Sequence, residues 1–142
     1  MKKLLACAFA LFLALGLCAC GINSSAASDA FTLKIRCESP DIYSIFYTCY
    51  IDGQTRGHGG MSDLDGQALT DGTGLELNFS RSFFEEGDDI AGFSIDFSPY
   101  GKDDVSEITT TAPLNIAAEY GKTYQIVFSG DRENGFQAQL IE

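Results

Sequence analysis

The chain has 142 residues with a formal net charge of −11, and 45% of its residues are hydrophobic. This length fits one domain, and the hydrophobic content excludes a chain that is disordered throughout. The acidic excess argues against a nucleic-acid-binding protein, because such proteins need basic patches that neutralise phosphates. It argues equally against docking on anionic lipid by charge.

The N-terminus has the layout of an export signal. Lys2 and Lys3 precede an apolar run that extends to Cys20. Gly16 interrupts this run, which is slightly short for a membrane span of about 20 residues, and no basic cluster follows it. We therefore expect residues 1–19 to be a signal peptide.

The end of the apolar run, Leu17-Cys18-Ala19-Cys20, resembles the lipobox of bacterial lipoproteins. In that class a Leu at −3 and a small residue at −1 precede an invariant Cys. Cys18 stands at −2, where Ala, Ser, Thr or Val is more usual. The resemblance implies that Cys20 receives a diacylglyceryl thioether, with fatty chains such as palmitate, and becomes the mature N-terminus. The alternatives are an uncleaved membrane anchor and an ordinary secretory signal.

Residues 20–30 form the lipidated cysteine and a Ser/Ala linker, whose flexible chain spans roughly 17 Å. Loss of residues 1–19 leaves seven basic against twenty acidic residues, a net charge of −13. A two-chain lipid anchors a protein far more durably than one chain. We therefore expect localisation at the extracytoplasmic face of the cell membrane, through lipid and without help from charge.

Residues 31–142 repeat apolar side chains at every second position, which is typical of strands. The first strand is expected at 31–37. The next, 43–51, is apolar on both faces, which favours a central strand. The glycine-rich stretch 52–74 reads mostly as loop, with a short strand near 61–69. Further strands are expected at 75–79, 93–97, 108–118 (broken at Pro113), 124–128 and 136–140.

About seven strands without a helix outside the signal indicate an all-β domain. Clean alternation is typical of antiparallel sheets with one wet face, and two such sheets make a β-sandwich of this size. It would be immunoglobulin-like in architecture only, since the chain has no Trp. The alternative is a small closed β-barrel.

Cys37 and Cys49 are the two cysteines of this domain, and the alternation places both on the apolar face. An even pair in an exported domain favours a disulfide, which would contribute roughly 3 kcal/mol. The alternative is two buried thiols that act as small hydrophobes. With a single histidine, a zinc site of the usual form is excluded.

His58 lies in a glycine-rich segment and could act as a general base beside a serine and an aspartate. No Gly-x-Ser-x-Gly nucleophile motif accompanies it, so an exposed loop histidine is the expectation. Glu85 and Glu86 are adjacent acids, a spacing that carries no geometry for glycoside hydrolysis.

Asp63 and Asp65 resemble part of a calcium loop, but the third Asp and the terminal Glu at the required spacing are missing. No metal or other cofactor is expected. A non-standard calcium site that adds Asp71 or the acidic cluster 85–89 is the weaker alternative to solvated turns.

Four aromatic residues fall in or beside predicted loops, where they could stack on a sugar, anchor a protein partner or close the ends of the core. We expect these four residues to close the ends of the core. They are Phe83, Phe84, Tyr100 and Tyr120. With no catalytic constellation, the sequence favours a lipid-anchored, envelope-exposed, non-catalytic binding or accessory module. Its partner would be an envelope protein or a glycan. The alternatives are a calcium-dependent glycan-binding module and an envelope hydrolase.

Overall fold

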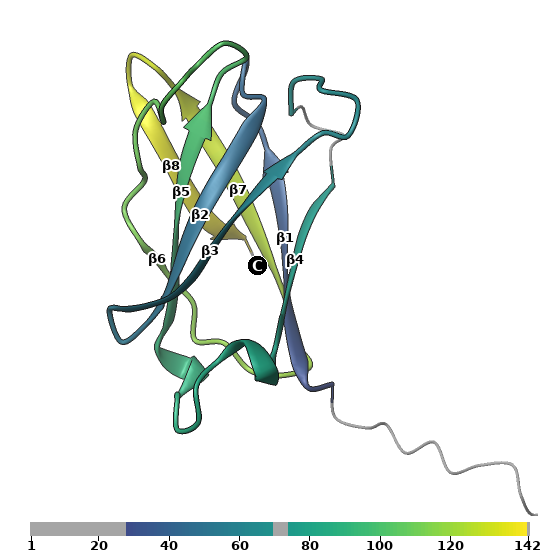
Figure 1. The fold of residues 1–142 in the computed structure, drawn as a ribbon, viewed down its shortest axis with the longest axis vertical. Coiled ribbons are helices and arrows are strands. Elements are labelled where there is room, and N and C mark those ends of the chain that lie inside the picture. The colour runs from purple at the N-terminus through teal and green to yellow at the C-terminus, as the bar shows by residue number, and fades with distance from the viewer. Residues whose placement is uncertain (1–27, 70–73, 142) are drawn as a thin grey trace, which may run out of the picture.

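The computed structural model describes residues 28–69 and 74–141, which form two packed β-sheets (Figure 1). Sheet A contains, in spatial order, β4 (Leu75–Ser80), β1 (Ala30–Cys37), β7 (Thr123–Asp131) and β8 (Gly135–Ile141). Sheet B contains β3 (Gln54–Ser62), β2 (Ser44–Ile51), β5 (Phe93–Tyr100) and β6 (Leu114–Asn115). Two short 3-10 turns, η1 (Arg81–Phe83) and η2 (Ile90–Gly92), lie between β4 and β5.

Both sheets are open, each with an edge strand on either side. The fold is therefore a β-sandwich, as the alternation predicts, and the alternative of a closed barrel is wrong. The described ranges contain eight strands, and β2 is a central strand of sheet B as expected. They hold no helix long and apolar enough to cross a membrane.

One pairing departs from the antiparallel expectation: β1 and β7 run parallel, with Leu33 opposite Tyr124 and Cys37 opposite Phe128. The other pairings are antiparallel. Parallel strands need a long crossover connection, and here the chain passes through sheet B between β1 and β7. Alternation of apolar and polar residues shows which face of a strand is buried, but it does not indicate whether the strand runs parallel or antiparallel to its neighbours.

The interior is filled by alternate side chains of the two sheets, with Phe31 at the centre of an aromatic cluster. Its ring centroid lies 5.2 Å from that of Phe79 and 5.1 Å from that of Phe93, which belongs to the opposite sheet. Phe84, Tyr120 and Tyr124 complete the ring contacts of Phe31. This cluster joins the sheets at the end where β1 begins.

Within the glycine-rich stretch 52–74, expected to be mostly loop, residues 54–62 are instead the edge strand β3. Residues 63–69 form no strand, so the short strand expected near 61–69 is wrong beyond Ser62. A Cβ on Gly57 would lie 2.6 Å from Cζ of Phe83, and one on Gly59 would lie 2.5 Å from the hydroxyl of Tyr47. The two aromatic rings therefore occupy the space of the missing inward side chains. His58, between these glycines, is an exposed residue of a strand and not of a loop.

The predicted strand over 108–118 shrinks to the two residues of β6. The segment still follows β5, because the N–H groups of Ile108, Thr111 and Ile116 donate to carbonyls of that strand. These bonds are too irregularly spaced for a continuous ladder, in keeping with Pro113, which has no N–H to donate.

The structure does not join Cys37 and Cys49 by the expected disulfide, and both side chains are buried. Because Phe31 packs on Phe93, which pairs with Ile51, the start of β1 faces the end of β2. Cys37 is thus offset from Cys49 by four residues along the strands, roughly 13 Å. A disulfide requires the two Cα atoms to lie within about 7 Å.

Candidate functional site

Two aromatic side chains lie together on the outer face of sheet B. Phe46 of β2 is 49% exposed although it is a large hydrophobic residue. Its ring centroid is 5.1 Å from that of Tyr100, at the end of β5, with the planes at 58°. The Phe46 ring also lies against Gly60 of β3, where a Cβ would come within 3.1 Å of it. Three neighbouring strands thus build one aromatic platform.

This platform forms one wall of an open groove of about 690 Å³, which we call the sheet-B groove. Tyr43 and the turn 101–104 form its other walls, and Ser44 and Ser62 add hydroxyl groups. The groove therefore combines aromatic faces and hydroxyl groups with two charged side chains, Lys102 and Asp104. Such a mixture suits a ligand that has both an apolar face and polar edges.

Two acids at the rim of the groove, Asp104 and Glu107, are held in place by hydrogen bonds. The carboxylate of Asp104 accepts from the N–H of Gly101 at 2.6 Å and from Nη2 of Arg132 at 2.5 Å. These two contacts, the backbone bond first, lower the pKa of Asp104. The hydroxyl of Tyr100 donates to Glu107 at 3.1 Å. Desolvation and this bond raise the pKa of Tyr100, so its phenol stays neutral at physiological pH.

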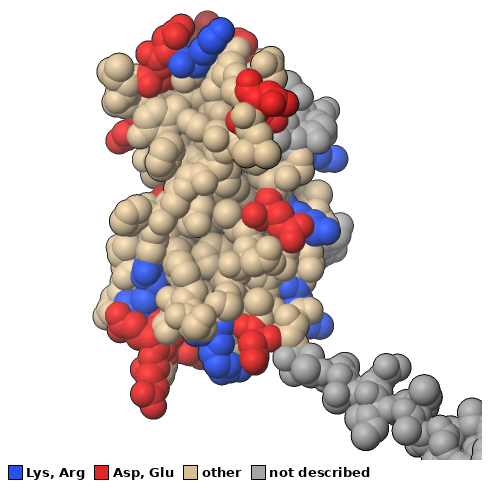
Figure 2. Space-filling view, turned by 45° about the vertical axis from the view of Figure 1, so that its right-hand side comes forward, with Lys and Arg blue, Asp and Glu red and all other residues tan. Residues whose placement is uncertain are grey.

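The rest of the outer face of sheet B is nearly free of exposed charge. Asp96 is only 7% exposed, and the hydroxyl of Tyr50 donates to its Oδ2 at 2.7 Å. This bond is the main cause of a raised pKa at Tyr50. Figure 2, turned so that the right-hand side of Figure 1 comes forward, shows charged side chains at both ends of the molecule and at mid-height on its right, beside a broad uncharged area.

His58 does not form a catalytic pair with the nearest acid of this face. Thr48 pairs with His58 on one side and with Asp96 on the other. The backbones of the histidine and the aspartate are thus two strand spacings apart, roughly 10 Å, and the carboxylate of Asp96 is engaged by the hydroxyl of Tyr50. The predicted exposure of His58 is confirmed, but the residue lies in β3 and not in a loop.

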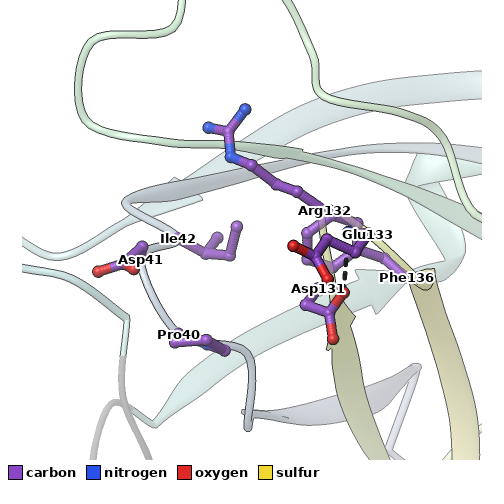
Figure 3. A pocket seen from close by; sticks show the side chains of 7 residues that line it. All are labelled: Pro40, Asp41, Ile42, Asp131, Arg132, Glu133 and Phe136. Carbon is purple, nitrogen blue, oxygen red and sulfur yellow. Dashed lines mark hydrogen bonds between the residues drawn. The ribbon is translucent and has the colours of Figure 1, made fainter.

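A second hollow, of about 360 Å³, lies between the β1–β2 turn and the β7–β8 hairpin (Figure 3). Asp131, Glu133 and Asp41 are among its lining residues. The carboxylate of Asp131 accepts from the side-chain amide of Asn134 and from the N–H groups of Asn134 and Glu133. These bonds lower its pKa and show that it shapes the hairpin.

Those of the weak calcium candidates that the structure describes lie in turns. Oδ1 of Asp63 accepts from the N–H groups of Asp65 and Gln67, at 2.9 and 3.2 Å. Asp71 lies outside the described residues. In the acidic cluster 85–89, Asp89 accepts from the N–H of Ala91 at 3.0 Å. Within the described ranges no three potential ligands gather in a way that could hold a metal ion.

Among the four predicted loop aromatics, Phe84 and Tyr120 are partly buried against the core, and Arg81 lies 4.3 Å over the ring of Tyr120. Phe83 is 37% exposed and packs on Phe79. Of these four residues, only Tyr100 lines the sheet-B groove.

Its neighbour Phe46 was not a predicted site residue, because alternation alone cannot distinguish an exposed aromatic from one covered by a second layer. The lipidation candidate Cys20 lies outside the described residues.

Neither a family model nor a curated protein matches the sequence. A protein from Eubacterium rectale, solved by NMR, is 9% identical over 84% of this chain and 96% of its own, with a TM-score of 0.41. A disulfide-locked mutant of intermedilysin, solved with human CD59, and pneumolysin are each 11% identical over 79% of this chain, with TM-scores of 0.39. This chain spans 24% and 23% of those two proteins, and likeness at this level does not bear on function.

Proposed function

We propose that this protein is a lipid-anchored, non-catalytic binding or accessory module of the extracytoplasmic face, and that its ligand occupies the sheet-B groove. The observation that carries the proposal is the exposed Phe46–Tyr100 platform. Desolvated aromatic side chains are the usual anchors of binding interfaces. The ligand is an envelope protein or a glycan with a partly apolar surface.

The position of the groove supports this proposal. Ala30 begins β1 at the end of the sandwich where Phe31 packs on Phe93, whereas Tyr100 ends β5 at the opposite end. The seven residues that separate these levels correspond to roughly 23 Å. Figure 1 shows β1 starting at the lower end of the sandwich. A lipid on Cys20 would therefore leave the groove on the side that faces away from the membrane.

The chemistry of the described residues favours binding over turnover. The acids near the groove are engaged: Asp104 with Gly101 and Arg132, and Glu107 with Tyr100. His58 lies two strands from Asp96, so the described outer face offers no base with an orienting acid.

The proposal is tested by cross-linked co-purification of the tagged full chain from its own membranes. The Phe46→Ala and Tyr100→Ala variants should lose the cross-linked protein or glycan partner. Leu64→Ala should retain it, because Leu64 is fully exposed outside the groove and controls for loss of an apolar side chain. Retention of the same partner by both groove variants would contradict the proposal.

The anchor is tested separately. Wild-type protein should fractionate with membranes and carry the mass of a diacylglyceryl group on Cys20, and Cys20→Ser should lose both. If the Cys20→Ser variant fractionates like the wild type, lipid attachment at Cys20 is wrong, whatever the groove binds.

A further inference from the structure

The C-terminal strand β8 is an open edge of sheet A. Among the described residues it pairs with β7 alone, in a continuous register from Asp131–Gly135 to Gln125–Ile141. The strand has seven residues, with neither a charged side chain nor a proline. An exposed, regular and uncharged edge presents unpaired N–H and C=O groups to any strand that can approach.

The other three edges are protected in ways that β8 is not. β6 has only two residues. β3 contains a register irregularity opposite Cys49 and Tyr50, and it carries Arg56. β4 carries Glu76, which lies 3.9 Å from Nζ of Lys34. Bulges, charges and short length all discourage strand addition, so β8 is the edge best suited to accept a strand.

We propose that β8 pairs antiparallel with β8 of a second copy of this chain, in the register centred on Ala138. The sequence around this residue is self-complementary. In this register Ala138 faces itself, Gln137 faces Gln139 of the second copy, and Phe136 faces Leu140. The central pairs thus join side chains of one kind, an arrangement that stabilises cross-strand contacts, and only the outermost pair, Gly135 with Ile141, joins unlike residues.

A second copy of the chain can cover the exposed apolar residues of β8, and charge does not oppose contact at this strand. Two molecules that each carry a charge of −11 repel one another wherever acidic surfaces meet, but β8 brings no charge to the contact. Leu140 and Ile141 are each 41% exposed. The pairing would cover Leu140 with Phe136 of the second copy.

The geometry also determines where the two N-termini lie. Antiparallel pairing places a two-fold axis perpendicular to the sheet, which reverses the direction of β1 in the second copy. The two chains then leave the dimer at opposite ends. If Cys20 carries lipid, such a dimer joins copies held by two facing membranes. The pairing itself rests on β8 and is independent of the proposed anchor and groove.

One strand from each copy makes a small contact, of the kind found in weak associations, so covalent trapping is the appropriate test. Full-length Gln137→Cys and Gln139→Cys variants, purified in detergent, are oxidised separately and as a mixture. Directly opposite Cα atoms are about 5 Å apart, within disulfide reach. Like positions, such as 137 and 137, are offset by two residues and fall beyond about 7 Å.

The expected result is a disulfide-linked dimer in the mixture and none with either variant alone. Both glutamines are exposed, so the variants should unfold at the wild-type urea concentration, and this is measured first. Absence of a dimer from the mixture of folded variants overturns the proposal. An equal yield of dimer from single-variant samples also overturns it, because that result indicates random collision or a different register.

Discussion

Arg56 and Asp88 form a bidentate ion pair: Nε donates to Oδ2 and Nη2 donates to Oδ1, both at 2.7 Å. The side chains are only 12% and 7% exposed, which makes this pair far less exposed than the other ion pairs of the described residues. Asp88 also accepts from the N–H of Glu85 at 2.9 Å. The pair therefore fastens the acidic loop 85–89 to the edge strand β3.

This ion pair makes stability depend on pH. The hydrogen bonds from Arg56, with a smaller contribution from the Glu85 N–H, hold the pKa of Asp88 below its ordinary value of 3.8. A carboxyl group whose pKa is lower in the folded state stabilises that state above its ordinary pKa, and this contribution is lost as the pH falls through the lower value.

We expect Asp88→Asn to lower the urea midpoint of unfolding by a constant amount between about pH 5 and pH 7. The difference from the wild type should close as the pH falls below about 4, because protonation of Asp88 then has the same effect as the substitution. Glu86→Gln in the same loop is the control and should follow the wild type. A difference that persists at low pH would show that the ion pair is not its source.

The side chains of the two buried cysteines should react slowly with alkylating reagents in the folded protein. Burial is the main cause that raises the pKa of Cys49 to about 11. Because the thiolate is the reactive form, alkylation of the native protein at pH 8 without reductant should be slow, and it should become complete in denaturant. Mass spectrometry of peptides that contain Cys37 and Cys49 measures both. If these two residues resist alkylation in denaturant without reductant, the result would indicate that they do form a disulfide.

Phe31 and Phe46 should differ sharply in their effect on stability. Phe31 is fully buried among aromatic rings of both sheets, so Phe31→Ala should lower the free energy of unfolding by about 3–5 kcal/mol. Phe46 is half-exposed, and Phe46→Ala should change it by less than about 1 kcal/mol. Urea denaturation compares the two variants. A large effect at Phe46 would mean that its role is structural, which would weaken the proposed binding role.

The glycines of β3 should not be equivalent. An added methyl group at Gly59 would meet the hydroxyl and ring carbons of Tyr47 within 3 Å, so Gly59→Ala should destabilise the fold by about 1–3 kcal/mol. At Gly60 the nearest atoms belong to the exposed ring of Phe46, at 3.1 Å, and this ring is free to turn outward. Gly60→Ala should therefore cost less in the same urea measurement. The reverse order would contradict the packing described for the two sides of β3.

The sequence predicted β1 and β7, whose side chains alternate between apolar and polar, and the central strand β2, which is apolar on both faces. It did not predict β3, because the inward positions 57 and 59 are glycines whose space is filled by rings from Phe83 and Tyr47. The signal for that strand lies in other segments of the chain. Alternation within one strand cannot reveal it.

The candidate site was predicted only in part. Tyr100 was recognised as an aromatic residue near a loop, but its contact with Phe46 depends on the pairing of β2 with β5. The distance between Cys37 and Cys49 depends in the same way on how the two sheets face each other. In the sequence, a spacing of twelve residues is compatible with a disulfide. In the structure, the way the two sheets face each other places the two cysteines four residues apart along the strands, which is too far for a disulfide.

β1 is hydrogen-bonded on both sides, to β4 and to β7, and the chain enters the domain through its first residue. A pull on the N-terminus, directed along the strand against a ligand held at the opposite end, would load both of these ladders in shear. All their bonds then share the force, whereas a strand peeled from an edge breaks them one after another. The domain is thus built to keep its shape when it is stretched along its length.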